Sequence, residues 1–137
     1  MSIPNRLPGL NIATVLLAVF AAVWISLEGA LWQVLVMGIG TTMIIAGYLA
    51  QRFWGGRTLS AKEWLGITAV LGLLVGIISV GMVLAFMAVK TGLHAHGPEF
   101  TPTQINWVLQ QLPLWGATGL LAGTAVGLLS IGFSNNN

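Results

Sequence analysis

Long apolar stretches dominate the chain and alternate with short polar segments. Four of these stretches reach the roughly 20 residues that a helix needs to cross about 30 Å of hydrocarbon. They cover residues 10–27, 31–50, 64–89 and 114–133. None of the four contains an aspartate, glutamate, lysine or arginine, so nothing opposes their insertion into lipid. The pattern predicts an all-α integral membrane protein with four transmembrane helices in a single membrane domain, residues 1–137.

Two helix starts carry capping patterns. Ser60 precedes the third span, and Glu63 stands three residues later, where its carboxylate can bond back to the cap. Thr101 and Gln104 repeat this spacing between the third and fourth spans, which predicts a helix over about residues 102–111. Apolar residues recur in it at helical spacing, so it is expected to lie flat on the membrane surface as a short amphipathic interfacial helix.

The few charged residues predict the orientation of the chain. One side, which holds the N-terminus and the loop after the second span, carries most of the basic residues. These are Arg6, Arg52, Arg57 and Lys62. The other side holds Lys90 together with Glu28 and Glu99. Because basic loops stay inside, both termini are expected in the cytoplasm and the chain in a bacterial-type cytoplasmic (inner) membrane.

Composition agrees with this arrangement and removes several classes of function. Apolar residues make up 56% of the chain and charged residues 6%, and the mean hydropathy is +0.90, so a water-soluble fold of this size could not cover its own surface. The net charge of +2 provides no basic stripe for a nucleic-acid partner. There is no cysteine, which excludes disulfides, thiolate metal sites and cysteine nucleophiles.

Small residues recur at every fourth position in the spans. The third span has Gly72 and Gly76, and the fourth has Gly119, Gly123 and Gly127. Lipid tails are as apolar as leucine, so helices in a bilayer associate through close approach across small residues. The five glycines are therefore predicted to be helix-packing positions, in the manner of a glycine zipper.

His94, His96 and Glu99 form the one titratable group of residues, on the loop after the third span. Two imidazoles and a carboxylate could share a metal ion. The competing interpretation is a polar loop among lipid headgroups, and the sequence favours it because the group is small. Haem and chlorophyll ligands usually lie inside a span, and neither histidine does. No cofactor of its own is predicted for this chain, although lipid, quinone or pigment could be shared with partner subunits.

No histidine, aspartate or lysine accompanies the serine and threonine hydroxyls of the spans, so the pattern indicates no catalytic site. Two functions rank ahead of a third, which would be an enzyme that uses His94, His96 and Glu99 on a metal ion. The first is a non-catalytic accessory subunit of a larger membrane protein complex, for example an electron-transport or photosynthetic assembly. The second is a small homo-oligomeric channel, transporter or holin-like pore. The spans show no continuous polar stripe that could line a pore, which favours the subunit and its contacts with other membrane subunits.

Overall fold

Five helices make up the regular structure of the described chain. The computed structural model describes residues 4–93, 97 and 99–135. In chain order the helices are α1 (Leu10–Ser26), α2 (Leu31–Trp54), α3 (Ala61–Leu93), α4 (Pro102–Gln110) and α5 (Leu112–Asn135). The all-α prediction is therefore confirmed.

Three of these helices are long and apolar enough to cross a membrane. They are α2 with 24 residues, α3 with 33 residues, and α5, in which the candidate span is Leu112–Ser134 with 23 residues. α1 is also apolar but has 17 residues, which at 1.5 Å each is about 26 Å, slightly less than the hydrocarbon core. The chain is thus a membrane protein with three candidate spans, and the crossing by α1 remains a prediction.

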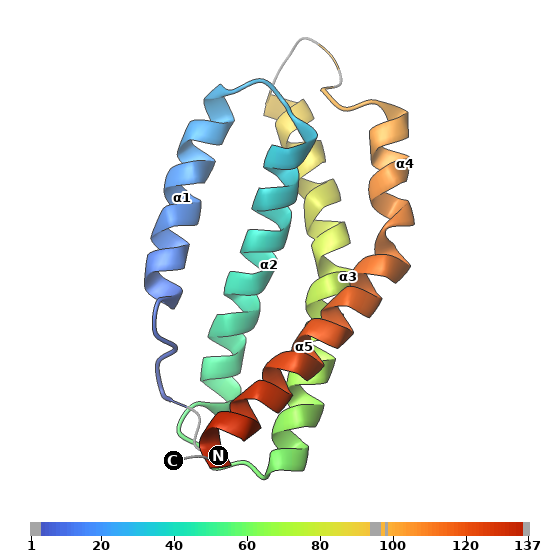
Figure 1. Ribbon diagram of the computed structural model, residues 1–137. Coiled ribbons are helices and arrows are strands. Elements are labelled where there is room, and N and C mark those ends of the chain that lie inside the picture. The colour runs from blue at the N-terminus through green and yellow to red at the C-terminus, as the bar shows by residue number, and fades with distance from the viewer. Residues whose placement is uncertain (1–3, 94–96, 98, 136–137) are drawn as a thin grey trace.

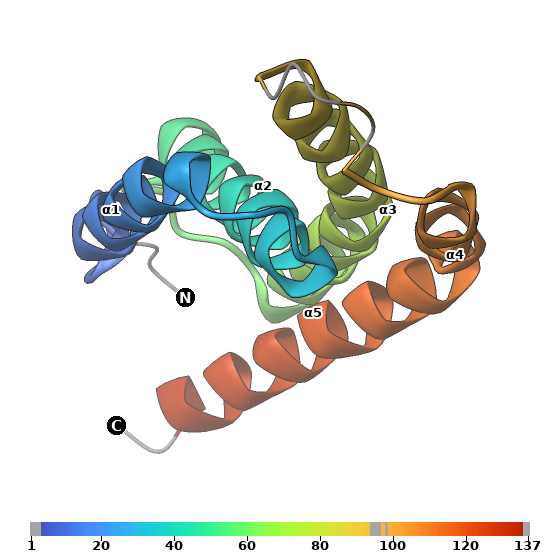
Figure 2. The same cartoon turned by 90° about the horizontal axis from the view of Figure 1, so that it is seen from above.

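The helices form an up-and-down bundle with α3 at its centre. Figure 1 shows α1, α2 and α3 running in alternate directions, with the described N-terminal segment, the α2–α3 loop and the end of α5 at one end of the bundle. That end also holds Arg6, Arg52, Arg57 and Lys62, and we call it the basic end. α3 packs against α2, α4 and, most extensively, α5, which crosses it obliquely (Figures 1 and 2).

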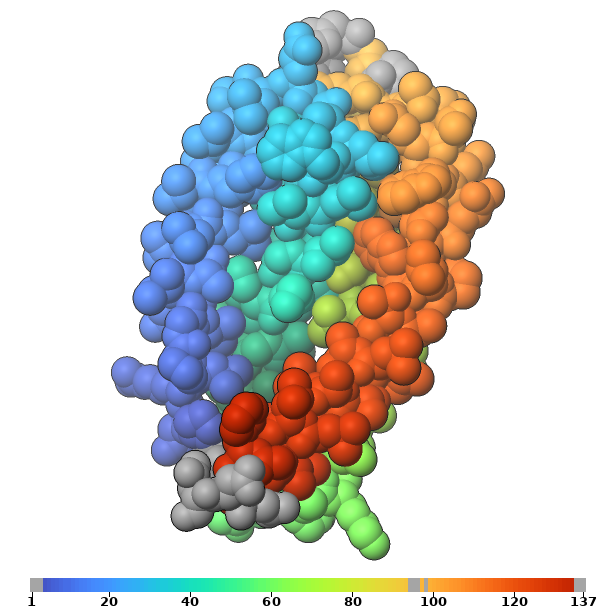
Figure 3. Space-filling view, viewed as in Figure 1, coloured from blue at the N-terminus to red at the C-terminus, as the bar shows by residue number. Residues whose placement is uncertain are grey.

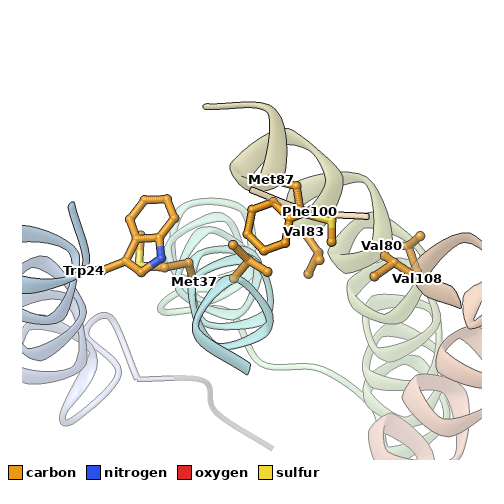
Figure 4. Close-up of a cluster of buried hydrophobic side chains, with 8 residues drawn as sticks. Trp24, Met37, Val80, Val83, Met87, Phe100 and Val108 are labelled. Carbon is orange, nitrogen blue, oxygen red and sulfur yellow. The ribbon is translucent and has the colours of Figure 1, made fainter. Parts of the chain in front are cut away.

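The buried apolar side chains form one cluster that is drawn out as a row across the helices. Figure 4 follows this row from Trp24 on α1, past Met37 on α2, to Val83 on α3 and Val108 on α4. From α5 the half-buried Trp115 packs against this row, and the buried described positions of that helix are glycines. α5 is therefore held in a different way from the other helices.

Both capping patterns are confirmed. The backbone N–H of Ser60 donates to the Glu63 carboxylate at 2.9 Å, and the Glu63 N–H donates to the Ser60 hydroxyl oxygen at 3.3 Å. Before α4, Thr101 and Gln104 form the same reciprocal pair at 2.8 and 3.2 Å. Each pair satisfies N–H groups that the first turn of a helix leaves without a backbone acceptor.

Two helices are longer than the apolar pattern predicts. The helix expected over residues 31–50 continues to Trp54, and the one expected over 64–89 spans Ala61–Leu93. The other two apolar stretches match α1 and α5 within two residues at each end. Hydropathy marks where a segment stops suiting lipid, whereas backbone hydrogen bonding continues into the polar turns on either side.

α4 is not oriented as expected. It begins one residue after Thr101, as predicted, but its axis follows the bundle beside α3, and Figure 2 shows it nearly end-on. Val108 is fully buried and holds α4 against α3. Gln111 alone separates α4 from α5, so the two read as one bent helix, with Pro113 unable to donate a backbone bond near the bend. The flat interfacial helix is therefore not confirmed.

Candidate functional site: a buried lysine that holds the end of α1

The predicted metal group falls largely outside the described residues. His94 and His96 are not among them, so their proposed role is neither supported nor contradicted. Glu99 is described and half-buried. Its side chain lies against Gly29 in the α1–α2 loop, so closely that a Cβ built on Gly29 would overlap the carboxylate. Within the described ranges no three histidine, aspartate or glutamate side chains gather as a metal site would require.

The sequence missed the most unusual residue of this region. Lys90, expected in the loop beyond the third span, lies in the last turns of α3 with 0% of its surface exposed. Its amino nitrogen donates to the carbonyl oxygens of Trp24 at 2.8 Å, Ile25 at 3.1 Å and Leu27 at 2.5 Å. A side chain of α3 thereby supplies hydrogen bonds to the carbonyl groups at the end of α1, more than sixty residues earlier in the chain.

The chemistry of a helix end explains this contact. The last carbonyl groups of a helix have no partner within it and carry a partial negative charge. An amino group has three hydrogens to donate and matches three such carbonyls. In apolar surroundings unpaired carbonyls are costly, so a donor there stabilises the fold more than it would in water. The lysine acts as a side-chain cap for α1.

Aromatic rings also lie beside this lysine. The Trp24 ring, 2% exposed, lies with its centroid 5.0 Å from the amino nitrogen, a distance suited to a cation–π interaction. Trp24 also meets Phe86 of α3 edge-on, with centroids 5.8 Å apart and planes at 89°. The end of α1 is therefore fixed to α3 by hydrogen bonds, by charge and by ring packing together.

A signal for this site exists in the sequence. Val80, Val83, Met87 and Lys90 follow one another at spacings of three and four, and all four are buried. A lysine in phase with the buried stripe of a helix predicts a buried amino group that needs acceptors. The expectation that a lysine marks the membrane boundary places Lys90 in the loop and so misses this signal.

The five predicted packing glycines all lie along the contact between α3 and α5. A Cβ built on Gly72 would overlap the Gly119 carbonyl oxygen and lie 2.9 Å from the Cα of Gly123. One built on Gly76 would overlap the Trp115 carbonyl oxygen. One built on Gly127 would overlap the side-chain hydroxyl of Thr68 and lie 3.3 Å from the Cα of Leu65. The backbones of the two helices therefore touch directly at Gly72, Gly76, Gly119 and Gly123.

Hydroxyl groups within the helices bond mainly to their own backbone. Five hydroxyl groups each donate to the carbonyl oxygen four residues earlier, at 2.7 to 3.0 Å. They are Thr14, Thr42, Thr68, Thr124 and Ser130. A hydroxyl used in this way is the usual case for a membrane helix and is not poised as a nucleophile.

An open apolar groove of about 460 Å³ separates α2 from α5, with α3 as its floor, and Figure 3 shows α3 between them. Its lining includes Ile39, Met43, Val75, Ser79, Trp115 and Thr118. The Ser79 hydroxyl is buried and has no hydrogen-bond partner among the described groups. The lining suits a lipid tail or an apolar helix better than a polar solute. Comparison with protein-family models, curated proteins and solved structures finds no match for this chain.

Proposed function

We propose that this chain is a non-catalytic subunit of a larger membrane assembly, crossing the bilayer four times with both ends in the cytoplasm. The observation that carries the proposal is the use of Lys90, the one charged side chain that is buried in the described bundle. It donates three hydrogen bonds to carbonyl groups at the end of α1, and these bonds help to hold the fold together. A transporter normally turns a buried charge toward a substrate or ion path.

The apolar surfaces support the same function. Large side chains on the outer faces of α1 and α5 are exposed, among them Ile12, Leu16, Leu121, Leu129 and Phe133. The groove between α2 and α5 is open and apolar. Lipid alone satisfies such surfaces, but an apolar helix of another subunit would also cover the groove and exclude lipid from it.

Affinity purification after mild solubilisation tests the subunit proposal. We expect the tagged chain to bring down a fixed set of unlike membrane proteins, with a constant ratio of masses in native mass spectrometry. Filling the groove with Thr118→Trp should reduce their recovery, whereas Ala117→Trp, at an exposed position of the same helix that does not line the groove, should not. A pure homo-oligomer that carries solute flux in liposomes would overturn the proposal and establish the pore.

Single-cysteine labelling tests the four crossings separately, and the lack of natural cysteine makes each label unique. In intact cells a membrane-impermeant maleimide should react with Glu28→Cys. It should reach Asn5→Cys and Arg57→Cys only after the cells are permeabilised. If Asn5→Cys were labelled from outside as readily as Glu28→Cys, α1 would not cross the bilayer.

A further inference from the structure

A polar pocket lies at the basic end, between the segment before α1 and the last turns of α2. It is open and has a volume of about 470 Å³. Its lining includes Asn5, Arg6, Asn11, Tyr48, Gln51 and Arg52. Two arginines that are far apart in the sequence therefore share one pocket, in a chain with five basic residues in all.

Hydrogen bonds fix the walls of this pocket. The Leu7 N–H donates to Gln51 Oε1 at 2.5 Å, which ties the segment before α1 to α2. The Tyr48 hydroxyl donates to Asn11 Oδ1 at 3.0 Å and lies 3.3 Å from the Thr14 hydroxyl. The positions of Arg6 and Arg52 are thereby set by neighbours that are themselves held in place.

Neither arginine is neutralised within the described part of the chain. No ion pair or hydrogen bond of the Arg6 or Arg52 side chain is found there. Glu63 is the acidic residue closest in sequence to the basic residues of this end. Its carboxylate accepts hydrogen bonds from Ser60 and not from either arginine. Two uncompensated guanidinium groups on one pocket attract an anion, and their planar arrays of donors match the oxygens of a phosphate.

An apolar groove continues from the pocket along the same two helices. It has a volume of about 270 Å³. On α1 the groove is lined by residues that come after Asn11 at helical spacing, namely Thr14, Ala18 and Ala21. On α2 it is lined by residues that come before Tyr48 at the same spacing, namely Ile44, Thr41 and Met37. Residues at these spacings share one face of a helix. The pocket and the groove therefore lie on one side of the α1–α2 pair, with Thr14 where they meet.

We propose that this side of the α1–α2 pair binds an anionic phospholipid, with the phosphate in the pocket of Arg6 and Arg52 and an acyl chain in the groove. The joining of a cationic pocket to an apolar groove distinguishes this ligand from a soluble phosphate, which needs the pocket alone. Basic pockets beside membrane helices bind the phosphate headgroups of lipids in this way. The inference needs α1 to lie in the bilayer, which the labelling of Asn5→Cys tests independently, and it needs no partner subunit.

Native mass spectrometry of the purified chain in mild detergent tests the proposal. Phosphatidylglycerol and phosphatidylcholine with identical acyl chains are offered in equal amounts. We expect the wild type to retain phosphatidylglycerol preferentially, and Arg6→Gln with Arg52→Gln to lower its binding about tenfold. A tenfold change corresponds to about 1.4 kcal/mol, a modest demand on two charge-assisted contacts.

A matched control removes the same charge outside the pocket. Arg57 and Lys62 lie at the same end of the bundle but do not line the pocket. The double variant Arg57→Gln with Lys62→Gln should therefore leave the lipid preference unchanged. If both double variants lost phosphatidylglycerol binding equally, the lipid would be attracted by the general positive charge of the basic end, and the proposal would be overturned. Equal binding of the two lipids by the wild type would overturn it as well.

The groove is tested by filling it. Ala18→Trp adds a large ring to an exposed position that lines the groove, whereas Ala13→Trp adds it to an exposed position that does not. The first should lower lipid binding and the second should not. Glycerophosphate, which lacks acyl chains, should compete poorly. If it displaced phosphatidylglycerol at equal concentration, or if Ala18→Trp bound lipid normally, the site would take a soluble phosphate and the lipid assignment would be wrong.

Discussion

Replacing Gly123 by leucine should detach α5 from α3 and lower the stability of the protein by at least about 3 kcal/mol, the upper part of the range for overpacked sites. A Cβ at this position overlaps the Thr68 carbonyl oxygen and lies 3.1 Å from the Cα of Gly72. Both are backbone atoms, so no side chain can rotate away to make room. Thermal unfolding in detergent, followed by tryptophan fluorescence, measures the loss.

Gly132 provides the matched control on the same helix. A Cβ there meets nothing within 4 Å, so Gly132→Leu should be neutral or slightly stabilising, since leucine favours a helix by about 0.8 kcal/mol over glycine. Equal melting temperatures for Gly123→Leu and the wild type would contradict the close contact between the two helices.

Replacing Lys90 by methionine should destabilise the protein by about 3 kcal/mol, because it leaves three carbonyl groups at the end of α1 without their donor. Methionine has a similar length and keeps most of the apolar packing. The carbonyls of Trp24, Ile25 and Leu27 then face an apolar side chain. Thermal unfolding measures the overall loss, and hydrogen exchange should show faster opening of residues 24–30.

Lys62→Met is the control for this substitution. Lys62 is exposed near the other end of the same helix, where surface substitutions usually change stability by less than about 0.5 kcal/mol. Lys90→Arg should restore only part of the loss, since the larger planar guanidinium must fit a site closed around an amino group. A Lys90→Met protein with unchanged melting and unchanged exchange would show that the three hydrogen bonds contribute nothing.

The features that were predicted correctly depend on residues close together in the sequence. The pairs Ser60–Glu63 and Thr101–Gln104 fix the starts of α3 and α4, and each involves a spacing of three residues. The apolar stretches locate the helices for the same reason, since each stretch determines its own compatibility with lipid. Such signals do not depend on how the helices pack.

The features that were missed depend on distant contacts. The role of Lys90 arises from the end of α1, and the upright position of α4 arises from the burial of Val108. The pocket of Arg6 and Arg52 likewise needs two segments that only the folded chain brings together. An apolar profile treats each position by itself, so it cannot place a donor from one helix on the acceptors of another.

The bond from Lys90 to Trp24 also bears on how the chain is made, since the two residues are 66 positions apart. Ribosomes add about 5–20 residues per second, so several seconds of synthesis separate the acceptor from its donor. During that interval the last turn of α1 must be hydrated or held by the insertion machinery. The nascent chain is therefore expected to enter the lipid after α3 has been inserted, and not as soon as α1 and α2 are complete.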